Sequence, residues 1–156
     1  MAKAVAANVA DGLELVIKRV LNAPRELVFA AWTQPEHMQK WNAAPSRVII
    51  TEKKGVVCSG QMFHVTMRTP EGEELRLQGR YLEVSPPARL VFTHAWLDNA
   101  GRPKHETIVT IELVDLGQQT ELTLRQAGLV SAESRDGHGH GWNGALDNLV
   151  EYLATC

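Results

Sequence analysis

The stretch SAESRDGHGHGWNGALDNLVEYLATC, residues 131–156, predicts the helix around which the fold is arranged. Its apolar residues recur at steps of three and four, which places them on one helical face. Ser131 is a suitable N-cap, and Asp147, Asn148 and Glu151 fall mostly on the opposite, polar face. We expect the apolar face to pack on a sheet through Trp142, Ala145, Leu146, Leu149 and Leu153.

Glycines are concentrated in the first half of this stretch, at positions 137, 139, 141 and 144. Each glycine inside a helix lowers its stability by roughly 1 kcal/mol relative to alanine. One interpretation is that the helix begins late, near Gly141, and that the preceding glycines form a loop. The other is that the helix starts earlier and that its first half, poor in side chains, lies over an opening in the fold.

The preceding residues predict strands and two short helices. Residues 13–21 form the first expected strand, Pro24 suits the first turn of a helix at 25–32, and Thr33 with Glu36 predicts a second helix at 35–41. Alternating apolar residues then predict strands at 47–53, 61–68, 74–84, 89–96, 106–114 and 120–126. Short connections favour an antiparallel sheet of about six to seven strands, covered on one side by the C-terminal helix. The expected fold class is α+β.

Length and charge limit the classes of protein that fit. The chain has 156 residues, of which 44% are hydrophobic and 22% charged, as in one soluble globular domain. We expect residues 1–12 to be a flexible tail and residues 13–156 to form that domain. The formal charge is −2 and the longest basic run is Lys53-Lys54, so nucleic acid and anionic membranes are not expected partners.

Two cysteines, Cys58 and Cys156, lack the Cys-x-x-Cys spacing of structural zinc sites and cannot form a disulfide framework. Reduced thiols favour a cytoplasmic protein. The apolar run at the N-terminus is too short for a membrane span or a good signal peptide.

Six motifs resemble, in their order along the chain, those of the START-like, helix-grip (SRPBCC) superfamily. Within it, the sequence resembles the subgroup related to the heat-shock protein 90 ATPase activator. The motifs are NAPRELVF at 22–29, WTQPEHM at 32–38 followed by Trp41, GRYLEV at 79–84, PPARLVFT at 86–93, TELTL at 120–124, and His138 with Gly141-Trp142 and Leu146. The resemblance extends over residues 13–153, nearly the whole chain.

This resemblance implies a curved antiparallel sheet that grips the long helix, with a cavity between them. Members of the superfamily bind small apolar or amphipathic ligands there, and some catalyse reactions such as polyketide cyclisation. Asn42 departs from the family, which often has an aromatic residue beside Trp41, so we expect a more polar cavity rim. Single-domain members often pair, and an open sheet leaves edge strands that need cover, so a homodimer is also expected.

Strand alternation predicts which side chains face this cavity. His94 is the principal polar group among them, because an imidazole can orient a ligand inside an apolar pocket. The alternative is a core histidine that is hydrogen-bonded to a neighbour such as Gln126 or Tyr81. The ligand-binding candidates are Trp41, Phe63, Met67, Tyr81, Leu90, Phe92, His94, Trp96, Trp142 and Leu146.

Catalytic and metal-binding patterns are sparse. No serine lies in a nucleophile elbow, and the His138/His140 pair has no obvious carboxylate or cysteine partner, so we expect no metal and no cofactor. Three function classes remain: a module that binds a small apolar or aromatic molecule; an enzyme that uses His94, Tyr81 or Glu83 in acid–base chemistry; or a protein-interaction domain whose partner is a chaperone.

Overall fold

The computed structural model describes residues 13–41 and 49–156. The expected tail at 1–12, the expectation for Asn42 and the first two residues of the strand predicted at 47–53 lie outside this range. The elements follow the predicted order and are β1 (Leu13–Leu21), α2 (Arg25–Thr33), α3 (Pro35–Trp41), β2 (Ile49–Lys54), β3 (Met62–Arg68), β4 (Glu74–Ser85), β5 (Arg89–Leu97), β6 (Pro103–Asp115), β7 (Thr120–Leu129) and α4 (Ala132–Leu153).

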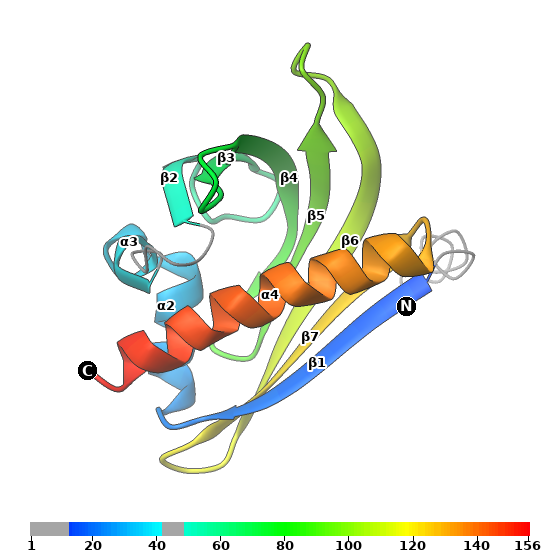
Figure 1. The fold of residues 1–156 in the computed structure, drawn as a ribbon. Helices are drawn as coiled ribbons and strands as arrows, with labels where there is room; N and C mark the ends of the chain where they lie inside the picture. Colours follow the sequence, from blue (N-terminus) through cyan, green and yellow to red (C-terminus); the bar gives the residue numbers. More distant parts are fainter. Residues whose placement is uncertain (1–12, 42–48) are drawn as a thin grey trace.

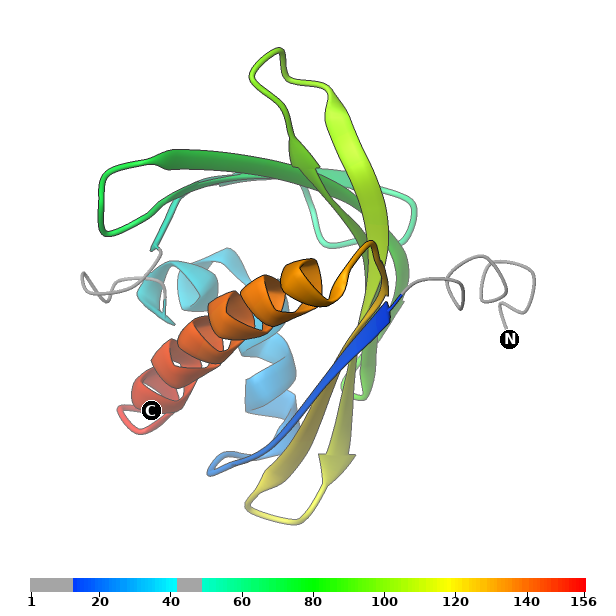
Figure 2. The ribbon, with the colours of Figure 1, turned by 45° about the vertical axis from the view of Figure 1, so that its right-hand side comes forward.

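The strands form one seven-stranded antiparallel sheet in the order β1-β7-β6-β5-β4-β3-β2. The sheet curves around α4, and the two short helices lie at its open side (Figures 1 and 2). Strands β6 and β7 form an antiparallel hairpin, with Ile111 opposite Leu124 and Leu113 opposite Leu122. The predicted α+β helix-grip fold is confirmed.

The C-terminal helix begins directly after Ser131, whose side chain accepts a hydrogen bond from the Ser134 amide at 3.0 Å. The interpretation in which the helix starts near Gly141 is therefore wrong. Leu146, Leu149 and Leu153 are buried on the predicted face. Asn148 was assigned to the polar face but is only 3% exposed, because this part of α4 has neighbours on two sides, the sheet and α3.

The helix covers only part of the sheet. It packs mainly against β1, with further contacts to β7 and α3. Arg19 of β1 forms an ion pair of 2.8 Å with Asp147 and a hydrogen bond of 3.0 Å with the Asn143 side chain. Buried Gly139 allows this close approach, because a Cβ there would lie 3.3 Å from Leu15 Cδ1. Helix α2 contacts β6, so the inner face of the sheet is covered by α2 as well as by α4.

In the described part of the chain, no helix is both long and apolar enough to cross a membrane. Cys58 and Cys156 are exposed free thiols.

Candidate functional site

Three of the predicted cavity residues form an aromatic cluster on the inner face of the sheet. Phe63 of β3, Tyr81 of β4 and Phe92 of β5 have ring centroids 4.9, 5.6 and 6.1 Å apart, and all three are buried. Gly79 makes this packing possible, because a Cβ there would lie only 2.4 Å from Phe63 Cζ and 2.0 Å from the Thr93 carbonyl oxygen. These three rings form an apolar floor at the β3–β5 part of the sheet, with Phe92 edge-on to the other two.

A second cluster lies beneath the first half of α4. The His94 ring centroid is 5.3 Å from that of Trp96 and 6.1 Å from that of Trp142. His138, on α4, lies 5.7 Å from His94 and accepts a 3.0 Å hydrogen bond through Nε2 from Trp96 Nε1. Its Nδ1 is 2.7 Å from the Ser134 carbonyl oxygen, which assigns the proton to Nδ1. His138 therefore connects α4 to β5.

A buried polar network reaches the backbone of His94. Trp142 Nε1 donates to Gln126 Oε1 at 2.8 Å, and Gln126 Nε2 donates to Thr107 Oγ1 at 2.9 Å. Thr107 in turn donates to the His94 carbonyl oxygen at 3.1 Å. Burial, and to a smaller extent the nearby His138, lowers the pKa of His94 to about 4, so its imidazole is neutral at physiological pH. Gln126, a predicted partner of the imidazole, is bonded instead to Trp142 and Thr107.

The remaining candidates are core residues or lie elsewhere. Leu90 and Leu146 are almost fully buried, and Met67 packs against the core. Trp41 donates from Nε1 to the Ala31 carbonyl oxygen at 2.9 Å and stacks edge-on against Trp32 at 5.2 Å. Trp41 also lines a 510 Å³ depression near the C-terminus, together with Lys40, Asn148, Glu151, Tyr152, Thr155 and Cys156.

A larger pocket, of 710 Å³, lies between α2, α3, β2 and the turn after β4. None of the ten predicted ligand-binding residues lines it. Its lining is mainly apolar, and several of its residues are exposed, so it opens to the surface. The lining residues are Glu26, Phe29, Ala30, Thr33, Gln34, Pro35, Met38, Ile50, Thr51, Glu52, Lys53, Gly55, Val56, Val57, Val84, Pro86 and Pro87.

Lys53 is the functional candidate that the sequence did not reveal. Its Nζ lies 5.4 Å from the ring centroid of Phe63 and 6.0 Å from that of Tyr81, and contacts Met38 Sδ at 3.7 Å. No carboxylate in the described residues pairs with it. Burial lowers the pKa of Lys53 to about 8. The signal that places it inward is its pairing with buried Val65 in the β2–β3 ladder.

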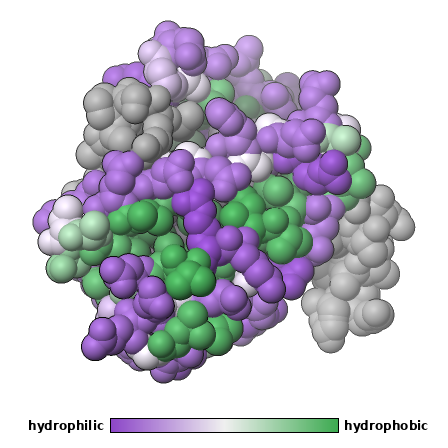
Figure 3. All heavy atoms as spheres, turned by 60° about the horizontal axis from the view of Figure 1, so that its bottom comes forward, coloured by the Kyte–Doolittle hydropathy of each residue, from purple (hydrophilic) through white to green (hydrophobic). Residues whose placement is uncertain are grey.

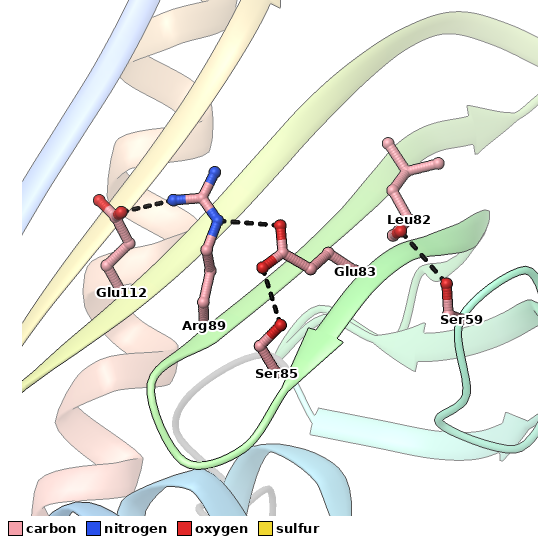
Figure 4. Close-up of polar contacts among 6 residues, drawn as sticks. All are labelled: Ser59, Leu82, Glu83, Ser85, Arg89 and Glu112. Carbon is pink, nitrogen blue, oxygen red and sulfur yellow. Dashed lines mark hydrogen bonds and ion pairs between the residues drawn. The ribbon is translucent and has the colours of Figure 1, made fainter. Parts of the chain in front are cut away.

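Glu83 takes no part in either cluster. Its carboxylate accepts hydrogen bonds from Ser85 Oγ at 2.8 Å and from Arg89 Nε at 3.1 Å, and Arg89 also bonds to Glu112 (Figure 4). The Ser85 hydrogen bond, and then Arg89, hold the pKa of Glu83 below its usual range. A half-exposed, ionised carboxylate with these partners is poorly placed to act as a general acid or base in the cavity.

Across the described ranges, 13–41 and 49–156, no group of three or more His, Cys, Asp or Glu side chains could hold a metal ion. His138 is engaged with Trp96 and the Ser134 carbonyl, and His140 is exposed.

Comparisons with known proteins agree with the fold. The model of the family described as "Activator of Hsp90 ATPase homolog 1-like protein" matches residues 22–154. The AHSA1 protein of Silicibacter pomeroyi has a solved structure with a TM-score of 0.83 and 23% identity, covering 92% of this chain and 99% of that one. The structure of a Nitrosomonas europaea protein has a TM-score of 0.73 and 29% identity, and the match covers 92% of this chain and 95% of that one. The structure of a Chromobacterium violaceum protein has a TM-score of 0.75 and 27% identity, and the match covers 90% of this chain and 96% of that one. No curated protein matches the sequence.

Proposed function

The chain belongs to the family of Activator of Hsp90 ATPase homolog 1-like proteins, and from this premise we propose that it binds a small apolar or amphipathic molecule. The proposed site is the pocket between α2, α3 and β2, rather than the space beneath the first half of α4. The observation that carries the proposal is the 710 Å³ volume of this pocket, which falls within the ~300–1,000 Å³ typical of ligand sites.

The construction of the two regions supports this choice. The pocket has side chains such as Phe29, Met38 and Ile50 as apolar walls, and Lys53 is the inward cation among its described lining residues. Beneath α4, by contrast, Trp142, Gln126 and Thr107 bond to one another, and the buried His94 imidazole is neutral, so it offers no charge to a ligand. A binding site needs an unfilled volume and an available polar group, and the pocket offers both.

A pocket-filling substitution tests this proposal. Ala30 lies on α2 and lines the pocket, so Ala30→Phe should occupy part of the volume without breaking the helix. The uncharged fluorescent probe N-phenyl-1-naphthylamine should bind wild-type protein, and Ala30→Phe should weaken this binding by about tenfold or more. Ala132→Phe, at the exposed first residue of α4, is the matched control and should bind the probe like wild type.

Equal probe binding by wild type, Ala30→Phe and Ala132→Phe would place the site elsewhere. Urea unfolding of each variant should accompany the titration, because a variant that loses cooperative unfolding reports on folding rather than on the pocket.

The enzyme alternative finds less support. Its three candidate groups lie in separate surroundings: Tyr81 in the aromatic floor, His94 in the polar network and Glu83 in the ion-pair network. Acid–base catalysis needs such groups within hydrogen-bond reach of one ligand.

We also propose that the protein is a homodimer and is cytoplasmic. The edge strand β1 exposes Val16 and Val20, which are 43% and 55% exposed, and the adjacent hairpin exposes Leu116. Figure 3 views this lower side of the molecule, where apolar areas are broken up by hydrophilic side chains. A second copy could cover the open edge of β1. A single 17.2 kDa species in sedimentation at tens of micromolar would exclude the dimer. The exposed thiols of Cys58 and Cys156 suit a reducing compartment.

A further inference from the structure

We propose that the ligand of this pocket carries one anionic group, a carboxylate, and that Lys53 receives it. The inference rests on the proposed function, because it assigns a ligand class to the same pocket. The Lys53 ammonium would add a charged contact that orients the ligand, which apolar walls alone would bind without specificity.

Within residues 13–41 and 49–156, no carboxylate pairs with the Lys53 ammonium. Its described contacts are the faces of Phe63 and Tyr81, at 5.4 and 6.0 Å, and Met38 Sδ at 3.7 Å, a weak acceptor. Aromatic faces and a thioether compensate only partly for the water that an ammonium loses on burial. A carboxylate that enters the pocket would supply the missing charge through a charge-assisted hydrogen bond.

Lys54, the next residue on β2, differs from Lys53 in exposure and in its ion pair. The Lys54 side chain is 71% exposed and pairs with Glu52 at 3.8 Å. Lys53 points to the other face of β2, where its pairing with Val65 places it over the apolar floor. The two lysines are adjacent in the sequence, but only Lys53 lines the pocket.

The charges around the pocket also predict the orientation of the bound ligand. Glu26 and Glu52 line the pocket and are exposed, so they lie at its mouth. Phe63 and Tyr81 are only 4% and 2% exposed, so the ammonium above their rings lies at the inner end. Carboxylates at the mouth repel an anionic group while the inner ammonium attracts it. An apolar acid would therefore bind with its carboxylate inward, against Lys53.

Competition binding tests the inference. Decanoic acid and decan-1-ol have the same chain length, and each can displace N-phenyl-1-naphthylamine from the protein at neutral pH. Wild type should prefer the acid, and Lys53→Met should lower the affinity for the acid by about 10- to 100-fold while leaving that for the alcohol unchanged. Lys54→Met is the matched control and should retain the wild-type preference. Lys53→Gln, which keeps polarity without charge, should behave as Lys53→Met does if the methionine variant folds poorly.

The outcomes separate this inference from the proposed function. An equal loss of acid and alcohol affinity in Lys53→Met would show that Lys53 is only part of the apolar wall. Unchanged acid affinity would show that the carboxylate lies elsewhere. Either result would refute the inference about Lys53 but leave the proposed ligand pocket unaffected. Failure of all three compounds to bind wild type would overturn the proposed function and the inference together.

Discussion

Replacing Lys53 by methionine should stabilise the protein. Methionine has a similar length, suits an apolar environment, and removes an ammonium whose burial is unfavourable. The pKa of Lys53 falls from 10.5 to about 8, and each pKa unit corresponds to about 1.4 kcal/mol, so the buried charge costs about 3 kcal/mol at neutral pH. Loss of the ring contacts with Phe63 and Tyr81 offsets about 1 kcal/mol of this gain. The expected net stabilisation is about 2 kcal/mol.

The pH dependence gives this prediction a distinctive form. Below pH 8 both the folded and the unfolded chain carry the proton on Lys53, and the unfavourable burial is fully present. Between pH 8 and 10.5 the unfolded chain binds more protons than the folded one, so the wild-type free energy of unfolding rises with pH. The variant has no such group, and its advantage over wild type should therefore shrink across this window.

Urea unfolding followed by tryptophan fluorescence at pH 7, 8, 9 and 10 measures both effects. Lys54→Met removes an exposed charge from the same strand and should change the free energy of unfolding by less than about 0.5 kcal/mol. A Lys53→Met variant that is no more stable than wild type at pH 7, with a constant difference up to pH 10, would refute the idea of a buried, uncompensated ammonium.

Three further changes test the fold and the core. Leu149→Ala should lower the free energy of unfolding in urea by roughly 2–5 kcal/mol, because Leu149 is 0% exposed. Val150→Ala, at a position that is 42% exposed, should lower it by less than about 1 kcal/mol. Equal losses in the two variants would mean that this face of α4 is misplaced. Gly141→Ala should stabilise by roughly 1 kcal/mol, since its Cβ would meet nothing within 4 Å, and a loss of stability would contradict an open position. The neutral His94, with a pKa of about 4 against 6.5 when unfolded, should make wild type lose up to about 3 kcal/mol as pH falls from 6.5 through 4. His94→Phe should flatten this acid loss, and an unchanged pH profile would show that His94 is not buried in its neutral form.

Local patterns in the sequence were sufficient to predict the elements and much of the sheet. The three-and-four spacing of Leu146, Leu149 and Leu153 predicted the buried face of α4, and Ser131 predicted its first residue. Alternation in β6 and β7 indicated which of their residues share the buried face of the sheet, such as Ile111 and Leu124. These features depend on neighbours in the chain, and a periodicity can reveal them.

The location of the pocket depends on contacts that no local pattern contains. It forms where α2 and α3 face β2 and the turn after β4, segments that tertiary packing brings together. The orientation of Lys53 depends on the register of β2 against β3, which shifts between Ile50 and Glu52. A one-residue irregularity of this kind moves a side chain to the other face of a sheet. Asn148 was misplaced for a similar reason, because the contact between α3 and α4 is set by tertiary packing.

The most direct test of the ligand site is a ¹H–¹⁵N correlation spectrum of the labelled protein, titrated with N-phenyl-1-naphthylamine. The indole N–H groups of Trp96 and Trp142, bonded to His138 and Gln126, report on the region beneath α4. The backbone amides of residues 26–38 and 50–57 report on the pocket. We predict saturable shifts in those amides and unchanged signals from the two indoles. Saturable shifts of the Trp96 and Trp142 indoles, with unchanged amides at 26–38 and 50–57, would contradict the proposed site.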